Sequence, residues 1–106
     1  MNASLPLQFG QVWESPDEAI GSMRYLIVSS DAYNAAFGDR RAIAVEIDSR
    51  RVFEGVYWEP IPDAGTAYLD RLTWVARRHL VELVAHLHPD RHEHVTQIIR
   101  NLIGDL

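Results

Sequence analysis

The chain has 106 residues, no cysteine and a formal net charge of −5. Its length suits one small core, so we expect a single domain over residues 1–106 and exclude a multi-domain enzyme. The lack of cysteine excludes disulfides and thiolate metal sites, and the acidic balance argues against nonspecific binding to duplex DNA. No leader-like segment opens the chain and no window reaches transmembrane length, so we expect a cytoplasmic protein without membrane contact.

The first third of the chain predicts two strands and a short helix. Residues 9–14 are rich in aromatic and β-branched types, and residues 25–28 are continuously apolar, as in a strand buried on both faces. Residues 15–22 contain proline and glycine and predict a loop between them. Ser30 and the following aspartate can cap a helix of one or two turns, which Gly38 ends.

The middle of the chain predicts three more strands, at residues 43–47, 52–58 and 68–75. In the first, Ile43, Val45 and Ile47 alternate with small or polar residues, which directs one face toward a core and leaves Asp48 at the polar end. Residues 48–51 have the spacing of a hairpin to the next strand. Residues 59–66 hold two prolines and a glycine and predict a loop.

The last part of the chain predicts a helix. Residues 79–87 fit both the strand and the helix period, so both assignments stay open. Pro89 suits the first helical position, and Gly104 follows as a stop. The apolar residues of one face are Val95, Ile98, Ile99, Leu102 and Ile103. Short, mostly antiparallel strands followed by a packed helix predict a small curled sheet or barrel of the α+β class.

Four histidines and two carboxylates lie within residues 86–94. The run is similar to the metallo-β-lactamase ligand motif, but Arg91 separates the aspartate from the next histidine, and the chain is too short for that fold. His88 and His92 lie one turn apart and could bind a metal; the alternative, which we prefer, is the solvated start of a helix. We therefore predict no metal site and no cofactor.

All ten basic residues are arginines, and six of them form the adjacent pairs Arg40-Arg41, Arg50-Arg51 and Arg77-Arg78. A guanidinium fork binds phosphate better than an ammonium does, so basic surface can exist locally on this acidic chain. Coding bias also produces a lysine-free composition, and that alternative stays open. The motifs of serine hydrolases, P-loop and dinucleotide-binding proteins and zinc proteases are not found in the sequence.

Several segments, in order, carry a resemblance to a known family. Phe9-Gly10-Gln11-Val12-Trp13 precedes a loop, and Arg24 then opens an apolar strand that ends in two serines, with Asn34 following. Leu69-Asp70-Arg71-Leu72-Thr73, Arg77-Arg78-His79-Leu80 and the terminal Ile99-Arg100-Asn101-Leu102-Ile103-Gly104 continue the pattern. Over nearly its whole length the chain resembles the MazF/PemK (Kid) toxins of bacterial toxin–antitoxin systems.

The resemblance implies a small SH3-like antiparallel β-barrel (MazF/CcdB-like) with a C-terminal helix, assembled as a homodimer. It also implies a cognate antitoxin and cleavage of single-stranded RNA (mRNA), without a metal, by attack of a ribose 2′-OH on the adjacent phosphate. Such a reaction needs a cation for the phosphorane oxyanion and groups that move protons. Arg24 matches the family arginine and would supply the cation; its alternative is a surface charge at a strand start.

The chain departs from the family pattern near the expected site. The proline after the arginine is Tyr25 here, and the third strand ends in Asp48 where the family has Pro-Ile-Thr or similar. A carboxylate there would act as a base and not as a donor. Asp70 matches an acidic position that serves as acid or base in some members, although their accompanying arginine corresponds to Tyr68. We predict Arg24, Asp48 and Asp70 as catalytic residues, and a structural role stays open for both carboxylates.

RNA contacts are expected from arginines and aromatic rings. Arg50 and Arg51 would bind phosphates, and Trp58 would stack an unpaired base. Trp13 and Trp74 could also stack bases, but we expect them to pack in the core or in a dimer interface. Asp31 and Asn34 are expected to shape the turn after the second strand.

Two other functions stay open. The related gyrase-poisoning CcdB toxins share the barrel and the final helix, and they bind protein through the extreme C-terminus. This chain ends in Ile103-Gly104-Asp105-Leu106 and lacks the Trp-Gly-Ile ending that goes with that activity. The other alternative is a catalytically silent relative that binds only RNA or an antitoxin.

Overall fold

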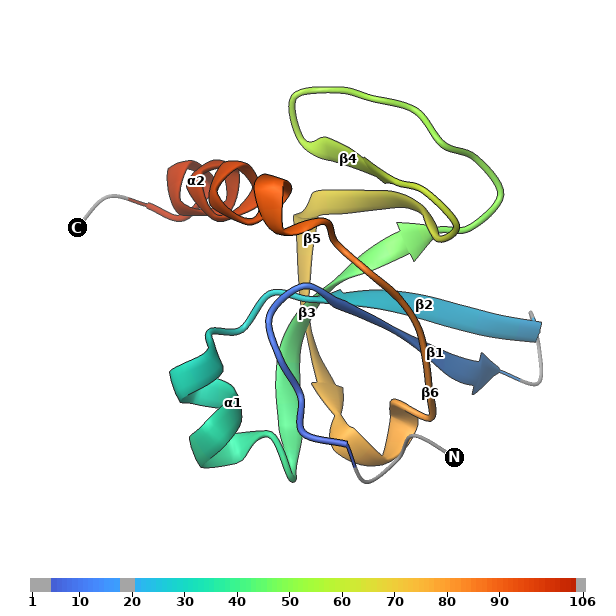
Figure 1. Ribbon diagram of the computed structural model, residues 1–106, viewed down its shortest axis with the longest axis vertical. Helices are drawn as coiled ribbons and strands as arrows, with labels where there is room; N and C mark the ends of the chain where they lie inside the picture. Colours follow the sequence, from blue (N-terminus) through green and yellow to red (C-terminus); the bar gives the residue numbers. More distant parts are fainter. Residues whose placement is uncertain (1–4, 18–20, 105–106) are drawn as a thin grey trace.

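The computed structural model describes residues 5–17 and 21–104. Its strands and helices are β1 (Gln11–Asp17), β2 (Gly21–Ile27), α1 (Asp31–Phe37), β3 (Arg41–Asp48), β4 (Trp58–Ile61), β5 (Gly65–Ala76), β6 (Glu82–His86) and α2 (His92–Leu102). Two 3-10 turns, η1 (Arg77–His79) and η2 (Pro89–Arg91), flank β6. The strands pair antiparallel in one sheet of order β4-β5-β3-β2-β1-β6, and α1 and α2 lie on its sides (Figure 1). This curled half-barrel with a C-terminal helix confirms the predicted α+β fold.

The curled sheet buries side chains on both of its faces, which gives two cores. Leu26 belongs to the core that α2 covers, and its neighbour Ile27 belongs to the other core, with both side chains fully buried. Successive side chains of a strand point to opposite faces, so a strand between two cores must be apolar throughout. The predicted strand at residues 25–28 is therefore confirmed as far as Ile27, with both faces buried at Leu26 and Ile27, whereas Val28 lies just past the strand and is half-buried.

A bend in β5 places its first residues beside the end of β3. Val45 pairs with Leu72, whereas Ile47 pairs with Ala67, so two steps on β3 correspond to five on β5. Such an irregularity bends the strand that carries the extra residues. The turn before β5 then passes close to the end of β3, where a Cβ atom on Gly65 (φ 128°) would collide with the backbone of Asp48. Glycine is the residue that permits this approach.

The strand and hairpin predicted after β3 are wrong. Only Gly55 of residues 52–57 pairs, in an isolated bridge with Trp58, and β4 occupies part of the predicted loop. The buried Thr66 side chain provides the reason. Its hydroxyl donates to the carbonyl of Arg51 (2.9 Å) and accepts from the N–H of Phe53 (3.0 Å), so a side chain satisfies backbone groups that a strand would pair in a ladder.

Other strand and helix boundaries differ by a few residues from those predicted from the sequence. The loop predicted at residues 15–22 is shorter, since β1 continues to Asp17 and β2 begins at Gly21, and residues 18–20 lie outside the described part. The Ser30 hydroxyl accepts from the N–H of Tyr33 (3.1 Å), which confirms the capped helix α1. Ile43 is only half-buried, whereas Ala42 and Ala44 on the other face of β3 are fully buried, so both faces of this strand pack and not the predicted one alone.

The C-terminal part of the chain resolves the open assignment at residues 79–87. Residues 82–86 form strand β6, and Pro89 begins a 3-10 turn that leads into α2. Ile103 lies just past the helix and is 56% exposed, so the predicted apolar face ends one position earlier. No helix in residues 5–17 and 21–104 is long and apolar enough to cross a bilayer.

Candidate nucleic-acid interface

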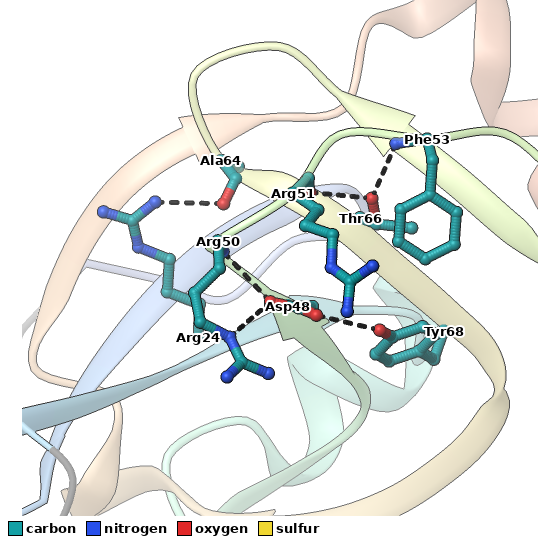
Figure 2. A network of polar contacts seen from close by, with 8 residues as sticks. All are labelled: Arg24, Asp48, Arg50, Arg51, Phe53, Ala64, Thr66 and Tyr68. Carbon is teal, nitrogen blue, oxygen red and sulfur yellow. Dashed lines mark hydrogen bonds and ion pairs between the residues drawn. The ribbon is translucent and has the colours of Figure 1, made fainter.

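Asp48 ends β3 and has a hydrogen-bond donor on each carboxylate oxygen. Its Oδ1 accepts from the backbone N–H (3.0 Å) and Nε (3.2 Å) of Arg50, and its Oδ2 accepts from the Tyr68 hydroxyl (3.0 Å; Figure 2). The side chain is only 7% exposed. These bonds, above all the one from the Arg50 backbone, lower the pKa of Asp48 to about 2. A carboxylate with so low a pKa is a weak general base at neutral pH.

Tyr68 connects Asp48 to an aromatic cluster. Burial, and then the bond to Asp48, raise the pKa of its hydroxyl, which therefore stays protonated as a donor. The ring of Tyr68 lies near those of Phe53 and Trp58, with centroids 6.3 and 6.5 Å away, and the latter two meet edge to face at 5.2 Å. Trp58 is 42% exposed. These three residues, the aromatic trio, give an accessible π surface beside Asp48.

A groove of about 650 Å³ lies at this end of the sheet. It is lined by the cations Arg50, Arg51 and Arg71 and by the carboxylates Glu46 and Asp48. The Arg71 guanidinium carbon lies 4.4 Å from the centroid of the Tyr68 ring, an attractive cation–π contact. Among the described residues of the groove lining, three cations stand against two carboxylates, a formal charge of +1 on a chain whose net charge is −5. The groove provides the local basic surface that the arginine pairs suggested.

Arg24 lies on the neighbouring strand, on the other face. It is the register partner of Ile47, so alternation turns its side chain away from that of Asp48. Figure 2 shows the Arg24 guanidinium directed away from Asp48, toward Ala64. Its Nε donates to Glu14 Oε2 (2.8 Å) and its Nη1 to the Ala64 carbonyl (3.0 Å). The Arg24 guanidinium is thus held beside the end of β3, and Arg24 is not among the residues that line the groove.

The structure brings four of the six predicted site residues together. Asp48, Arg50 and Arg51 line the groove, and Trp58 belongs to the aromatic trio that Tyr68 joins to it. The other two lie apart. Arg24 points from the opposite face, and Asp70 is exposed on the bent part of β5, where its side chain makes no hydrogen bond or ion pair with the described residues.

Sequence reasoning missed the residues that organise the site. Tyr68 and Arg71 line the groove, Thr66 anchors the loop that carries Arg51, and Glu14 holds Arg24. The predicted strand at residues 68–75 contains two of them, but nothing in the sequence marks the bend that turns them toward Asp48. Glu14 was open to prediction from strand pairing, since it lies directly opposite Arg24 in register.

The tryptophans and the turn after β2 can also be placed. Trp13 is fully buried and donates from Nε1 to Gln11 Oε1 (2.9 Å), which confirms its packing role. Trp74 is 59% exposed and so is not a core residue of this chain; its place in a dimer interface stays a prediction. Asn34 is buried and bonds to the backbone and hydroxyl of Ser29, which confirms that it shapes the turn.

The histidine-rich segment has its own bonds. His88 Nδ1 accepts from the N–H of Asp90 (3.1 Å), and His92 Nε2 lies 3.1 Å from the Leu87 carbonyl. Arg91 binds both oxygens of the buried Glu59 at 2.7 and 2.8 Å. Within the described ranges, no group of three or more histidine or carboxylate side chains is arranged to hold a metal ion. His88 thus caps the turn η2, and Arg91 ties the start of α2 to Glu59.

Similarity to known proteins is structural. No protein-family model and no curated protein sequence matches the chain. An endoribonuclease from Mycobacterial species superposes with a TM-score of 0.74 at 19% identity, over 93% of this chain and 92% of that one. An endoribonuclease in complex with its cognate antitoxin, also from Mycobacterial species, gives 0.73 at 20% identity, over 92% and 95% of the two chains.

A MazE–MazF crystal structure from Deinococcus radiodurans superposes with a TM-score of 0.70 at 22% identity, over 96% of this chain and 99% of that one. Crystalline MazF from the same organism gives 0.66, also at 22% identity. The superpositions extend over nearly the whole of both chains and establish the fold. At identities this low they establish the fold alone. The predicted resemblance is confirmed at that level: the chain has the fold of MazF.

Proposed function

We propose that the chain is the toxin of a type II toxin–antitoxin system and an endoribonuclease that cleaves single-stranded RNA. The observation that carries the proposal is the groove at the end of β3, where three arginines adjoin the aromatic trio within a MazF fold. Guanidinium groups bind phosphates, and aromatic faces stack unpaired bases. Two proteins with this fold, both from Mycobacterial species, are endoribonucleases, which supports the reaction.

The reaction needs no bound group beyond the RNA. The ribose 2′-oxygen attacks the adjacent phosphorus and the 5′-oxygen leaves, which gives a 2′,3′-cyclic phosphate and a 5′-hydroxyl. Arg24 would stabilise the phosphorane charge, since Glu14 and the Ala64 carbonyl already fix its fork. RNA bound through Arg50 and Arg51 would cross the end of β3 to reach it. Asp70 would accept the proton of the 2′-OH and return it to the leaving 5′-oxygen, because the Asp48 oxygens are already occupied.

We also propose the partners that such a toxin needs. Antitoxin-bound structures share the fold, which supports a cognate antitoxin as the protein partner. The exposed side chains of Leu72 and Trp74 on β5 support a homodimer, because exposed apolar residues grouped on a small protein mark an interaction surface. A toxin that cleaves mRNA would act in the cytoplasm, and we propose that location for the chain.

The function is tested with a synthetic single-stranded RNA library and the purified chain. We expect cleavage that leaves cyclic phosphate ends and persists in EDTA, because the substrate supplies its own nucleophile. A matched oligonucleotide with 2′-deoxyribose at the cleaved position is the control and should stay intact. Failure to cleave any RNA would overturn the proposal, and gyrase inhibition in the same preparation would then indicate a CcdB-like poison.

A further inference from the structure

Asp48 holds together two parts of the chain that meet only in the folded protein. One oxygen binds the backbone and side chain of Arg50 in the loop after β3, and the other binds Tyr68 on β5, twenty residues further along. The carboxylate is nearly inaccessible, whereas the side chain of Arg50 is 84% exposed. The Asp48 carboxylate therefore binds Arg50 and Tyr68, and its oxygens are not available to a substrate.

The bonds of Asp48 determine how two guanidinium groups face the groove. Asp48 occupies Nε of Arg50, so the outer nitrogens of that fork remain for another anion (Figure 2). Tyr68 is fixed at its hydroxyl, and its ring carries the Arg71 guanidinium at 4.4 Å. One carboxylate thus orients Arg50 directly and Arg71 through the Tyr68 ring, and both arginines line the same groove.

We propose that Asp48 is a positioning residue that holds Arg50 and, through Tyr68, Arg71 as a two-guanidinium site for a phosphate group of single-stranded RNA. The identity of the ligand rests on the proposed function; the arrangement rests on the bonds described above. Two preoriented forks suit the several oxygens of a phosphate better than mobile side chains do, because less conformational entropy is lost on binding. Asp48 takes no part in proton transfer on this view.

The direction in which Asp48→Ala changes RNA affinity distinguishes a positioning role from a purely electrostatic effect. Asp48→Ala removes a negative charge from a phosphate-binding groove, which by charge alone would tighten RNA binding. If Asp48 positions the two arginines, the same change weakens binding by about tenfold, the effect of losing one charge-assisted hydrogen bond. Asp48→Asn keeps an acceptor for Arg50 and should retain most of the affinity, whereas a general base would lose its function.

The measurement is fluorescence anisotropy with a 2′-O-methyl RNA oligonucleotide, which cannot be cleaved, over a series of salt concentrations. Arg50→Ala and Arg71→Ala should each weaken binding and reduce the slope of log K against log salt by about 0.7, the value for one lost phosphate contact on a single strand. Arg40→Ala, an exposed arginine outside the groove, is the matched control and should change neither. Tyr68→Phe should lower the contribution of Arg71 to RNA binding and leave the contribution of Arg50 unchanged.

Asp48→Ala can also act by loosening the fold, so a double-mutant cycle accompanies it. In the Arg50→Ala background, the loss caused by Asp48→Ala should shrink, because the residue that it positions is gone. Unchanged or tighter binding by Asp48→Ala, or full additivity with Arg50→Ala, would overturn the proposal. Since the probe is not cleavable, a protein that binds RNA this way without cleaving it would refute the nuclease function and leave the role of Asp48 intact.

Discussion

Arg24 and Glu14 face each other across β1 and β2, with 2.8 Å between Nε and Oε2. The Ala64 carbonyl holds a second nitrogen of the same fork at 3.0 Å. The Arg24 side chain is 26% exposed, so it is held in place and still accessible. A cation held in place before substrate binds needs no reorganisation when charge develops on a phosphate, which is the condition for transition-state stabilisation.

Replacement of Arg24 tests this condition. Arg24→Ala should lower the single-turnover cleavage rate by about 100-fold or more, since one preorganised oxyanion donor contributes about 3 kcal/mol. Stability should fall by less than about 1 kcal/mol, because the ion pair with Glu14 is partly solvated. Arg24→Lys retains the charge without the fork and should recover only part of the rate. Cleavage at the wild-type rate by Arg24→Ala would refute the site.

Asp70 is the proposed catalytic carboxylate that makes no bond to the described residues. If it carries a proton, Asp70→Asn should lower kcat by about 100-fold or more with little change in KM, because an amide cannot accept the proton. A surface role would leave kcat unchanged, and Asp39→Asn, another exposed aspartate, shows the size of that effect.

The bond between Arg91 and Glu59 joins the start of α2 to β4. Arg91→Ala should destabilise the protein by about 3 kcal/mol, because it leaves the Glu59 carboxylate, 3% exposed, without its bidentate partner. Urea unfolding gives the value. Arg100→Ala, an exposed arginine on the same helix, is the control and should cost less than about 0.5 kcal/mol. Equal effects of the two changes would mean that the ion pair does not anchor α2.

A homodimer is expected to bury the exposed apolar side chains of β5. Light scattering at micromolar concentration should show a dimer, and Trp74→Ser should shift it toward monomer, because Trp74 is 59% exposed in the single chain. Val56 is 70% exposed on the loop before β4, and Val56→Ser, as the control, should leave the dimer unchanged. A monomeric wild-type protein would remove the proposed interface.

Local signals predicted the elements of this fold, and long-range contacts decided the site. The Ser30 cap, the apolar strand at Leu26 and the spacing of α2 depend on neighbouring residues, and the structure confirms them. The irregular loop after β3 depends on Thr66, and the tyrosine that reaches Asp48 depends on the bend of β5. A sequence shows that a carboxylate is present, but not which donors will fold onto it.

The low pKa of Asp48 makes its contribution to the free energy of unfolding depend on pH. Its folded-state pKa, about 2, lies below the ordinary value of 3.8, so the unfolded chain binds the proton more readily than the native protein does. The contribution of Asp48 to stability is therefore complete above about pH 4 and is lost as the pH falls through about 2.

Asp48→Asn removes this titration and leaves the other carboxylates in place. The difference in unfolding free energy between wild type and Asp48→Asn should be constant from pH 7 to about pH 4.5 and shrink steadily toward pH 2. Urea denaturation across that range measures it. A difference that is independent of pH would mean that Arg50 and Tyr68 do not hold Asp48 in its ionised form.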